Sequence, residues 1–127
     1  MKREIELIRK IFFELEKFPA KIESSFDYSI KVKNYSKEII DYHLVLMQQA
    51  NFIQGIIQRS VINKNITIYY DTLEITWEGH EFLDTIRHNK VWKYLKEKTK
   101  NSDIPFTVIK ELGKTILVKL VFPQSPL

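Results

Sequence analysis

The 127-residue sequence has no cysteine, three glycines and four prolines. Without cysteine, a disulfide framework, a thiolate zinc site and a thiol nucleophile are all excluded. The three glycines do not form a glycine-rich phosphate-binding loop. No apolar run approaches the roughly 20 residues that a membrane span needs, and no apolar segment of a secretory signal follows the charged amino terminus. We therefore expect a cytoplasmic protein with no membrane contact.

The residues that are present favour a folded domain. Hydrophobic residues make up 44% of the chain and aromatic residues 13%, which is too much apolar content for a disordered protein. The length suits one hydrophobic core. We therefore predict a single domain over residues 1–122, followed by a short tail over residues 123–127.

Two amphipathic helices and a strand are expected in the first half of the chain. Residues 3–17 place Ile5, Ile8, Phe12 and Leu15 at helical spacing, and Pro19 is expected to stop this helix. Residues 26–32 alternate apolar and polar side chains, which predicts a short strand. Residues 36–51 resume helical spacing, with Ser36 as the N-cap and Asn51 as a left-handed terminator.

The second half begins with a change of period. Residues 52–77 are rich in β-branched and aromatic side chains and predict a β-ribbon, with its tip at residues 63–65 and a further turn at residues 71–72. A third helix is expected from residue 78, capped by Thr76 and with a break near Asn89. A fourth is expected to open at Asp103 and Pro105, with an apolar face of Ile109, Leu112, Ile116 and Leu120.

This order predicts an α+β fold of the winged helix-turn-helix type, with the ribbon as an antiparallel wing and an extra C-terminal helix. One feature departs from that pattern. Residues 18–35 look too extended to supply the helix that normally lies between the first helix and the recognition helix.

Three stretches carry a resemblance to a known family. They are residues 1–11, residues 35–44 with 50–53, and residues 73–87, which include the run Glu-Gly-His-Glu-Phe-Leu-Asp. They resemble the YjcQ-like family of uncharacterised winged-helix proteins from Firmicutes and their phages. More closely, they resemble the prophage relatives of that family that carry a domain of unknown function. The resemblance implies a winged-helix fold and carries no activity over to this chain.

The helix over residues 36–51 stands where a winged helix reads the major groove of DNA. Amide side chains can bond adenine, and cations can contact phosphate or guanine. The candidate nucleic-acid-binding residues are outward-facing side chains of this helix and cations of the ribbon and the third helix. They are Lys37, Tyr42, Gln48, Gln49, Arg59, Lys64, Lys93, Lys96 and Lys100. Against this interpretation, Glu38 and Asp41 stand in the first turns of the helix, where they would repel phosphate.

The other candidate sites have simpler explanations. His80, Asp84 and His88 fall at helical spacing, but His-Glu-x-x-Asp is not a zinc-protease motif, so we expect no metal. His43 is expected to be a hydrogen-bonded, partly buried histidine, and Trp77 and Trp92 are expected in the core. No spacing of carboxylates, or of serine and histidine, supports catalysis. We expect no enzymatic activity, no cofactor and no small-molecule substrate.

Two functions follow from these observations. The first is a non-enzymatic protein-interaction module that binds another protein or, through the terminal helix, a second copy of itself, because residues 104–122 are rich in apolar side chains. The second is a DNA-binding transcriptional regulator that uses residues 36–51 and the wing near Lys64. The two acidic residues of the helix favour the first.

Overall fold

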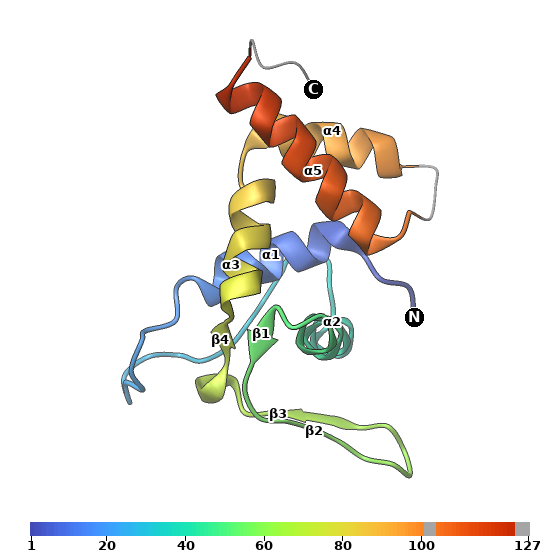
Figure 1. Ribbon diagram of the computed structural model, residues 1–127. Helices are drawn as coiled ribbons and strands as arrows, with labels where there is room; N and C mark the ends of the chain where they lie inside the picture. Colours follow the sequence, from blue (N-terminus) through green and yellow to red (C-terminus); the bar gives the residue numbers. More distant parts are fainter. Residues whose placement is uncertain (101–103, 124–127) are drawn as a thin grey trace. The chain divides into compact units, whose positions relative to one another are not determined.

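The computed structural model describes residues 1–100 and 104–123, and within these the chain is α+β, as predicted (Figure 1). The described residues form five α-helices and four short strands. In chain order they are α1 (Ile5–Leu15), α2 (Lys37–Gln49), β1 (Ile53–Gln54), β2 (Ile57–Arg59), β3 (Ile66–Ile68), β4 (Glu74–Ile75), α3 (Trp77–Ile86), α4 (Asn89–Thr99) and α5 (Phe106–Val121). None of these helices is both long enough and apolar enough to cross a membrane.

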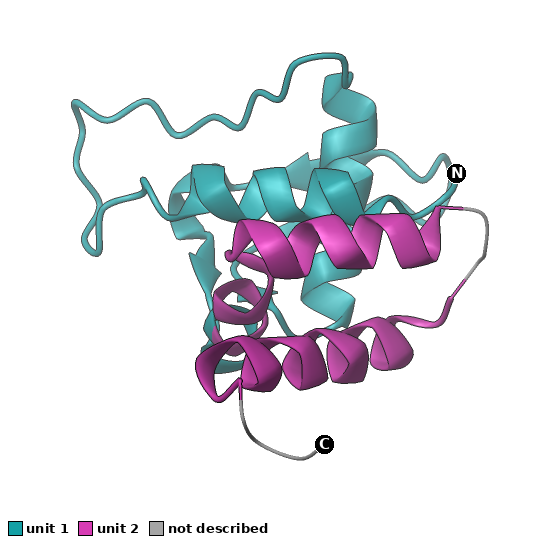
Figure 2. Ribbon diagram, turned by 90° about the horizontal axis from the view of Figure 1, so that it is seen from above, with its two compact units in different colours: residues 1–80 teal, residues 81–127 magenta. Residues whose placement is uncertain are grey.

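The chain divides into two compact units, Met1–His80 and Glu81–Leu127, which are coloured separately in Figure 2 and are described one at a time here. The boundary falls within α3. A single domain over residues 1–122 stays a prediction. Of the expected tail, residues 124–127 lie outside the described residues.

The first unit is built on α1 and α2, which pack against each other. The apolar face of α1 is buried as its spacing predicts, with Leu7, Ile11 and Phe12 fully covered. The helix is shorter than the predicted residues 3–17, because Glu4 is its N-cap and it ends at Leu15. It therefore stops four residues before Pro19, so the proline does not terminate it.

The strand predicted over residues 26–32 is wrong, and residues 16–36 contain neither helix nor strand. The alternation of side chains reports burial on one side of an extended segment. Phe26 and Tyr28 both pack against Phe18, with ring centroids 5.5 and 5.4 Å away, and Ile30 is buried. Local bonds replace a β-ladder, among them the Glu23 N–H donating to the Tyr28 hydroxyl at 2.9 Å.

Both predicted ends of α2 are confirmed. The Ser36 side chain accepts from the Ile39 N–H at 3.3 Å, which makes Ser36 the N-cap. At the other end Asn51 has a φ of 62°, the left-handed conformation that ends a helix. The chain then turns back so that Phe52 and Ile53 are buried.

The predicted ribbon exists but is divided into two antiparallel pairs. β1 pairs with β4, with Ile53 opposite Ile75, and β2 pairs with β3, with Arg59 opposite Ile66. Gly55 separates the pairs at a φ of 148°, which side chains with a Cβ rarely adopt. The turn expected at residues 71–72 is a 3-10 helix over Tyr70–Thr72.

The second unit contains the end of α3 together with α4 and α5, which pack side by side (Figure 2). The break expected near Asn89 is confirmed, since α3 ends at Ile86 and α4 begins at Asn89. The rings of Phe82 and Phe106 lie 4.8 Å apart between centroids. Pro105 is the N-cap of α5, as predicted, and Asp103 lies outside the described residues.

Two predictions about buried side chains need correction. Trp92 is buried, but Trp77 is 80% exposed at the first residue of α3 and is no core anchor. On α5 the predicted apolar face is only partly covered. Ile109 is buried, Leu112 and Ile116 are half-buried, and Leu120 is exposed. Apolar residues occur on every side of α5, so helical periodicity alone does not identify the buried face.

Candidate nucleic-acid interface

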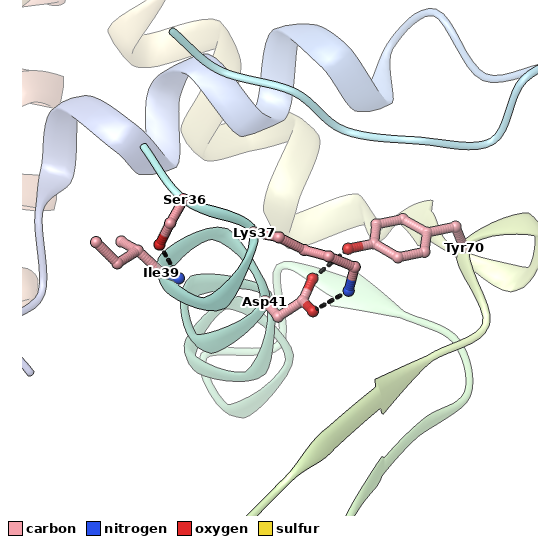
Figure 3. Close-up of polar contacts among 5 residues, drawn as sticks. All are labelled: Ser36, Lys37, Ile39, Asp41 and Tyr70. Atoms are coloured by element: carbon pink, nitrogen blue, oxygen red, sulfur yellow. Dashed lines mark hydrogen bonds and ion pairs between the residues drawn. The ribbon is translucent and has the colours of Figure 1, made fainter. Parts of the chain in front are cut away.

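Asp41, in the amino-terminal half of α2, is a buried acid that contacts Lys37 and Tyr70 (Figure 3). Asp41 is only 5% exposed. One carboxylate oxygen accepts a hydrogen bond from the Tyr70 hydroxyl, and the other lies 2.5 Å from the Lys37 ammonium. Asp41 therefore joins α2 to the 3-10 helix that follows β3.

This arrangement changes the charge that α2 presents. The interpretation of Asp41 as a surface acid that repels phosphate is wrong, because its charge is buried and matched by Lys37. Burial, followed by the hydrogen bond to Asp41 and its negative charge, raises the pKa of Tyr70 well above its ordinary value. The phenol therefore stays protonated and donates to Asp41. Glu38 remains exposed in the first turn.

A second contact joins the middle of α2 to the ribbon. The Arg59 guanidinium lies over the Tyr42 ring, 5.9 Å from its centroid. Tyr42 is half-buried on α2 and Arg59 is exposed on β2. A cation stacked on an aromatic face is held in place while its N–H groups stay available for other acceptors. This brings two of the predicted site residues together from separate elements.

The two glutamines at the end of α2 have different environments. The Gln48 amide donates to the Gly55 carbonyl at 3.0 Å, so it holds the start of the ribbon against α2. This bond gives Gln48 a role in the fold, and its role in base recognition stays a prediction. Gln49 is the last residue of α2, and its side chain is exposed to solvent.

Lys64 lies at the tip of the β2–β3 ribbon, as predicted. It is exposed and has a φ of 62°, and its N–H donates to the Ser60 carbonyl at 3.0 Å. In Figure 1 the ribbon extends beyond the rest of the first unit, beside α2, which is seen end on. Among the described residues, 55–70 carry Arg59 and Lys64 and no acidic side chain.

Sequence reasoning missed two further cations of the first unit. Lys31 and Lys33 are both exposed in the segment that leads into α2. They alternate with half-buried Val32, so their spacing was a usable signal.

The remaining candidates, Lys93, Lys96 and Lys100, belong to the second unit. They lie on α4 and its C-cap, not on the third helix as predicted, because the helix breaks before Asn89. All three are exposed. A nucleic-acid role for them stays a prediction, separate from the surface of α2 and the ribbon.

Among the described residues, no three histidine or acidic side chains are grouped so that they could bind a metal ion. His88 is the N-cap of α4 and lies outside α3, so the helical spacing assumed for His80, Asp84 and His88 does not extend across all three.

His43 is hydrogen-bonded, as expected, but it is fully buried and not partly buried as predicted. Its Nε2 accepts from the Glu4 N–H at 3.0 Å, and Nδ1 lies 2.8 Å from the Ile39 carbonyl. Because Nε2 is the acceptor, Nδ1 carries the proton and donates to Ile39. Tyr35 adds to this junction through its hydroxyl, which donates to Glu4 at 3.4 Å, and burial together with Glu4 and Glu6 raises the pKa of Tyr35.

A shallow groove of about 250 Å³ elsewhere in the first unit has the opposite electrostatic character. Its lining includes the apolar residues Leu15, Phe18 and Leu73 and the acidic residues Glu16, Asp71 and Glu74. Three acids would repel a phosphate backbone. The groove is therefore not part of the candidate interface.

Comparison with known proteins identifies a family and a relative of this chain. The model of a family described as "Hypothetical protein (DUF2513)" matches residues 2–104. A protein of Haemophilus influenzae, described as an uncharacterized protein, is 32% identical over 123 residues, which cover 95% of this chain and 99% of the relative. No solved structure matches. A relationship to YjcQ-like proteins and an origin in Firmicutes or their phages stay predictions.

Proposed function

This chain belongs to the DUF2513 family, and we propose that its first unit is a winged-helix-like module that binds duplex DNA through α2 and the β2–β3 ribbon. The observation that carries the proposal is the stacking of Arg59 on Tyr42. It connects the face of α2 to a ribbon that has two cations and no acid. A helix followed by a basic hairpin is a surface that suits the major groove and its neighbouring phosphates.

The charge of this surface supports the same proposal. Asp41 was one of the two acids that argued against DNA binding, and its carboxylate is bonded to Lys37 and Tyr70 inside the unit. The exposed cations that we propose to contact phosphate are then Arg59 and Lys64 in the ribbon and Lys31 and Lys33 in the segment that leads into α2, with Glu38 opposing them. Four phosphate contacts give modest affinity that depends strongly on salt, since each contact contributes about 0.9 to the slope of log K against log salt.

We expect the chain to bind a labelled duplex of about 25 base pairs, measured by fluorescence anisotropy, with a salt slope of about −3 to −4. Arg59→Glu combined with Lys64→Glu should weaken binding at least about tenfold and reduce the slope by about 2. Lys21→Glu is the matched control, because Lys21 is an exposed cation in the segment before α2. Absence of binding at low salt with tens of micromolar protein, or an equal loss in the control, would overturn the proposal.

A second candidate function is self-association through α5, which one specific observation favours. Val118, Leu120, Val121 and Phe122 are 37–61% exposed, so the last turn of this helix presents a nearly continuous apolar surface. In the described part of α5 only Ile109 and Gly113 are buried. Exposed apolar patches of this kind mark protein contact sites, and the occupant that we propose is α5 of a second copy.

This candidate predicts a concentration-dependent dimer in sedimentation equilibrium at micromolar protein. Val121→Glu should weaken the dimer at least about tenfold, because it places a charge within the apolar contact. Val108→Glu is the matched control, an exposed valine near the other end of the same helix. A strict monomer at about 100 µM wild-type protein would rule out this function without affecting DNA binding.

A further inference from the structure

The tip of the β2–β3 ribbon presents two apolar side chains to solvent. Val61 is 98% exposed and Ile62 is 97% exposed, so neither contributes to the core of the first unit. Both are β-branched, with few side-chain rotamers. A fold that needed only a solvated hairpin would gain from polar residues at these positions. The pair therefore requires an explanation outside the folding of the unit.

The conformation of the tip is fixed by polar groups and not by these two side chains. The Ser60 N–H donates to the Asn65 carbonyl at 2.8 Å, and the Lys64 N–H returns to the Ser60 carbonyl at 3.0 Å. The Asn63 side chain accepts from the Asn65 N–H at 3.0 Å. Val61 and Ile62 are consequently held at the end of a hydrogen-bonded turn, in one arrangement, with both side chains unburied.

The surroundings of the pair indicate the chemistry of its partner. Arg59 lies two residues before Val61, Lys64 lies two residues after Ile62, and residues 55–70 have no acid. An apolar tip between cations is complementary to a partner with a polyanionic rim and a narrow apolar interior. A stable protein interface buries roughly 800 Å² per partner, and two side chains are too few to supply that area.

Duplex DNA has both properties, since the stacked bases lie beneath two phosphate strands. Aliphatic side chains that enter the minor groove can part a base step and bend the duplex when flanking cations hold the backbone. We propose that Val61 and Ile62 form a wedge that inserts into the minor groove while Arg59 and Lys64 contact the adjacent phosphates. The inference rests on the proposed function and adds to it a mode of contact and a deformation of the DNA.

The test uses the full chain and a 25-base-pair duplex with 2-aminopurine at a central TA step, which unstacks easily. Binding of the wild type should raise the 2-aminopurine fluorescence, and energy transfer between end labels should report a bend. Val61→Ser combined with Ile62→Ser should abolish both signals and weaken binding about tenfold, while the salt slope stays unchanged because the cations remain. Ile22→Ser is the matched control, an aliphatic residue 69% exposed in the same unit.

The outcomes separate this inference from the function on which it rests. If the wild type binds the duplex with the expected salt slope but the fluorescence does not change, the wedge is wrong and DNA binding stands. If the wild type does not bind, both are wrong. If the double serine variant instead loses binding to vesicles of phosphatidylcholine and phosphatidylserine and keeps its duplex signals, the tip contacts membranes and the wedge is overturned.

Discussion

Replacing Gly79 by alanine should lower the free energy of unfolding by about 3 kcal/mol or more. A Cβ at this position would lie 2.1 Å from the Phe52 carbonyl oxygen and 2.7 Å from a methyl group of Ile75. The carbonyl cannot move away cheaply, because it accepts the Thr76 N–H at 2.9 Å. The loss should appear in urea unfolding and as a fall in Tm of about 12 °C.

Gly113→Ala is the control for this substitution. Its Cβ would lie 3.0 Å from a methyl group of Thr85 and 3.4 Å from Leu95, both side chains that can shift slightly. Alanine also gains about 1 kcal/mol of helix propensity over glycine. We expect a net change within about 1 kcal/mol. A loss at Gly79 no larger than the loss at Gly113 would refute the close approach of Gly79 to Phe52.

Replacing Asp41 by alanine should cost about 2–3 kcal/mol, the range for a lost hydrogen bond to a charged group. The Tyr70 hydroxyl would lose its acceptor in a partly buried position. Lys37→Ala should cost less than about 1 kcal/mol, because the Lys37 side chain is 73% exposed and water screens its half of the pair. Denaturant unfolding of both variants checks this difference.

The partnership of Asp41 with Tyr70 can be isolated by a double-mutant cycle. Tyr70→Phe removes only the hydroxyl, and the double variant should cost little more than the larger single change. Equal and additive losses would show that the two side chains act independently.

The same pair predicts a dependence on alkaline pH. The pKa of Tyr70 is raised in the folded protein, so the folded state retains the phenol proton at a pH where the unfolded state releases it. The stability contributed by Tyr70 is therefore fully present below about pH 10, the ordinary tyrosine pKa, and is lost as the pH rises above it. The difference in unfolding free energy between wild type and Tyr70→Phe should shrink over that range.

Local patterns in the sequence identified the elements whose formation depends on local forces. Ser36 and Asn51 mark the ends of α2 because an N-cap side chain and a left-handed residue act within a few positions of themselves. The break before Asn89 was also predicted from residues close to it in the sequence. The strand over residues 26–32 failed because a strand requires a partner, and the period of the side chains reports only which face is buried.

The candidate site shows the same limit at the level of single residues. Sequence spacing placed Asp41 and Gln48 on an outward face, since both are polar residues of an amphipathic helix. Their partners, Tyr70 and Gly55, flank the β2–β3 ribbon and lie 29 and 7 residues away in the chain. No helical period encodes such contacts. Arg59 and Lys64 are exposed, as their place in a short hairpin predicts, because such a hairpin is solvated whatever packs elsewhere.

The ribbon pairs only three residues of β2 with three of β3, and two-stranded hairpins have little stability of their own. We expect its amide hydrogens to exchange far faster than those of α1 and α2, through local openings that leave the helices folded. Doubling the length of its loop would cost only about 0.6 kcal/mol of closure entropy. Insertions near Asn63 should therefore be tolerated, so that the length of this hairpin can change while the packing of the helices stays the same.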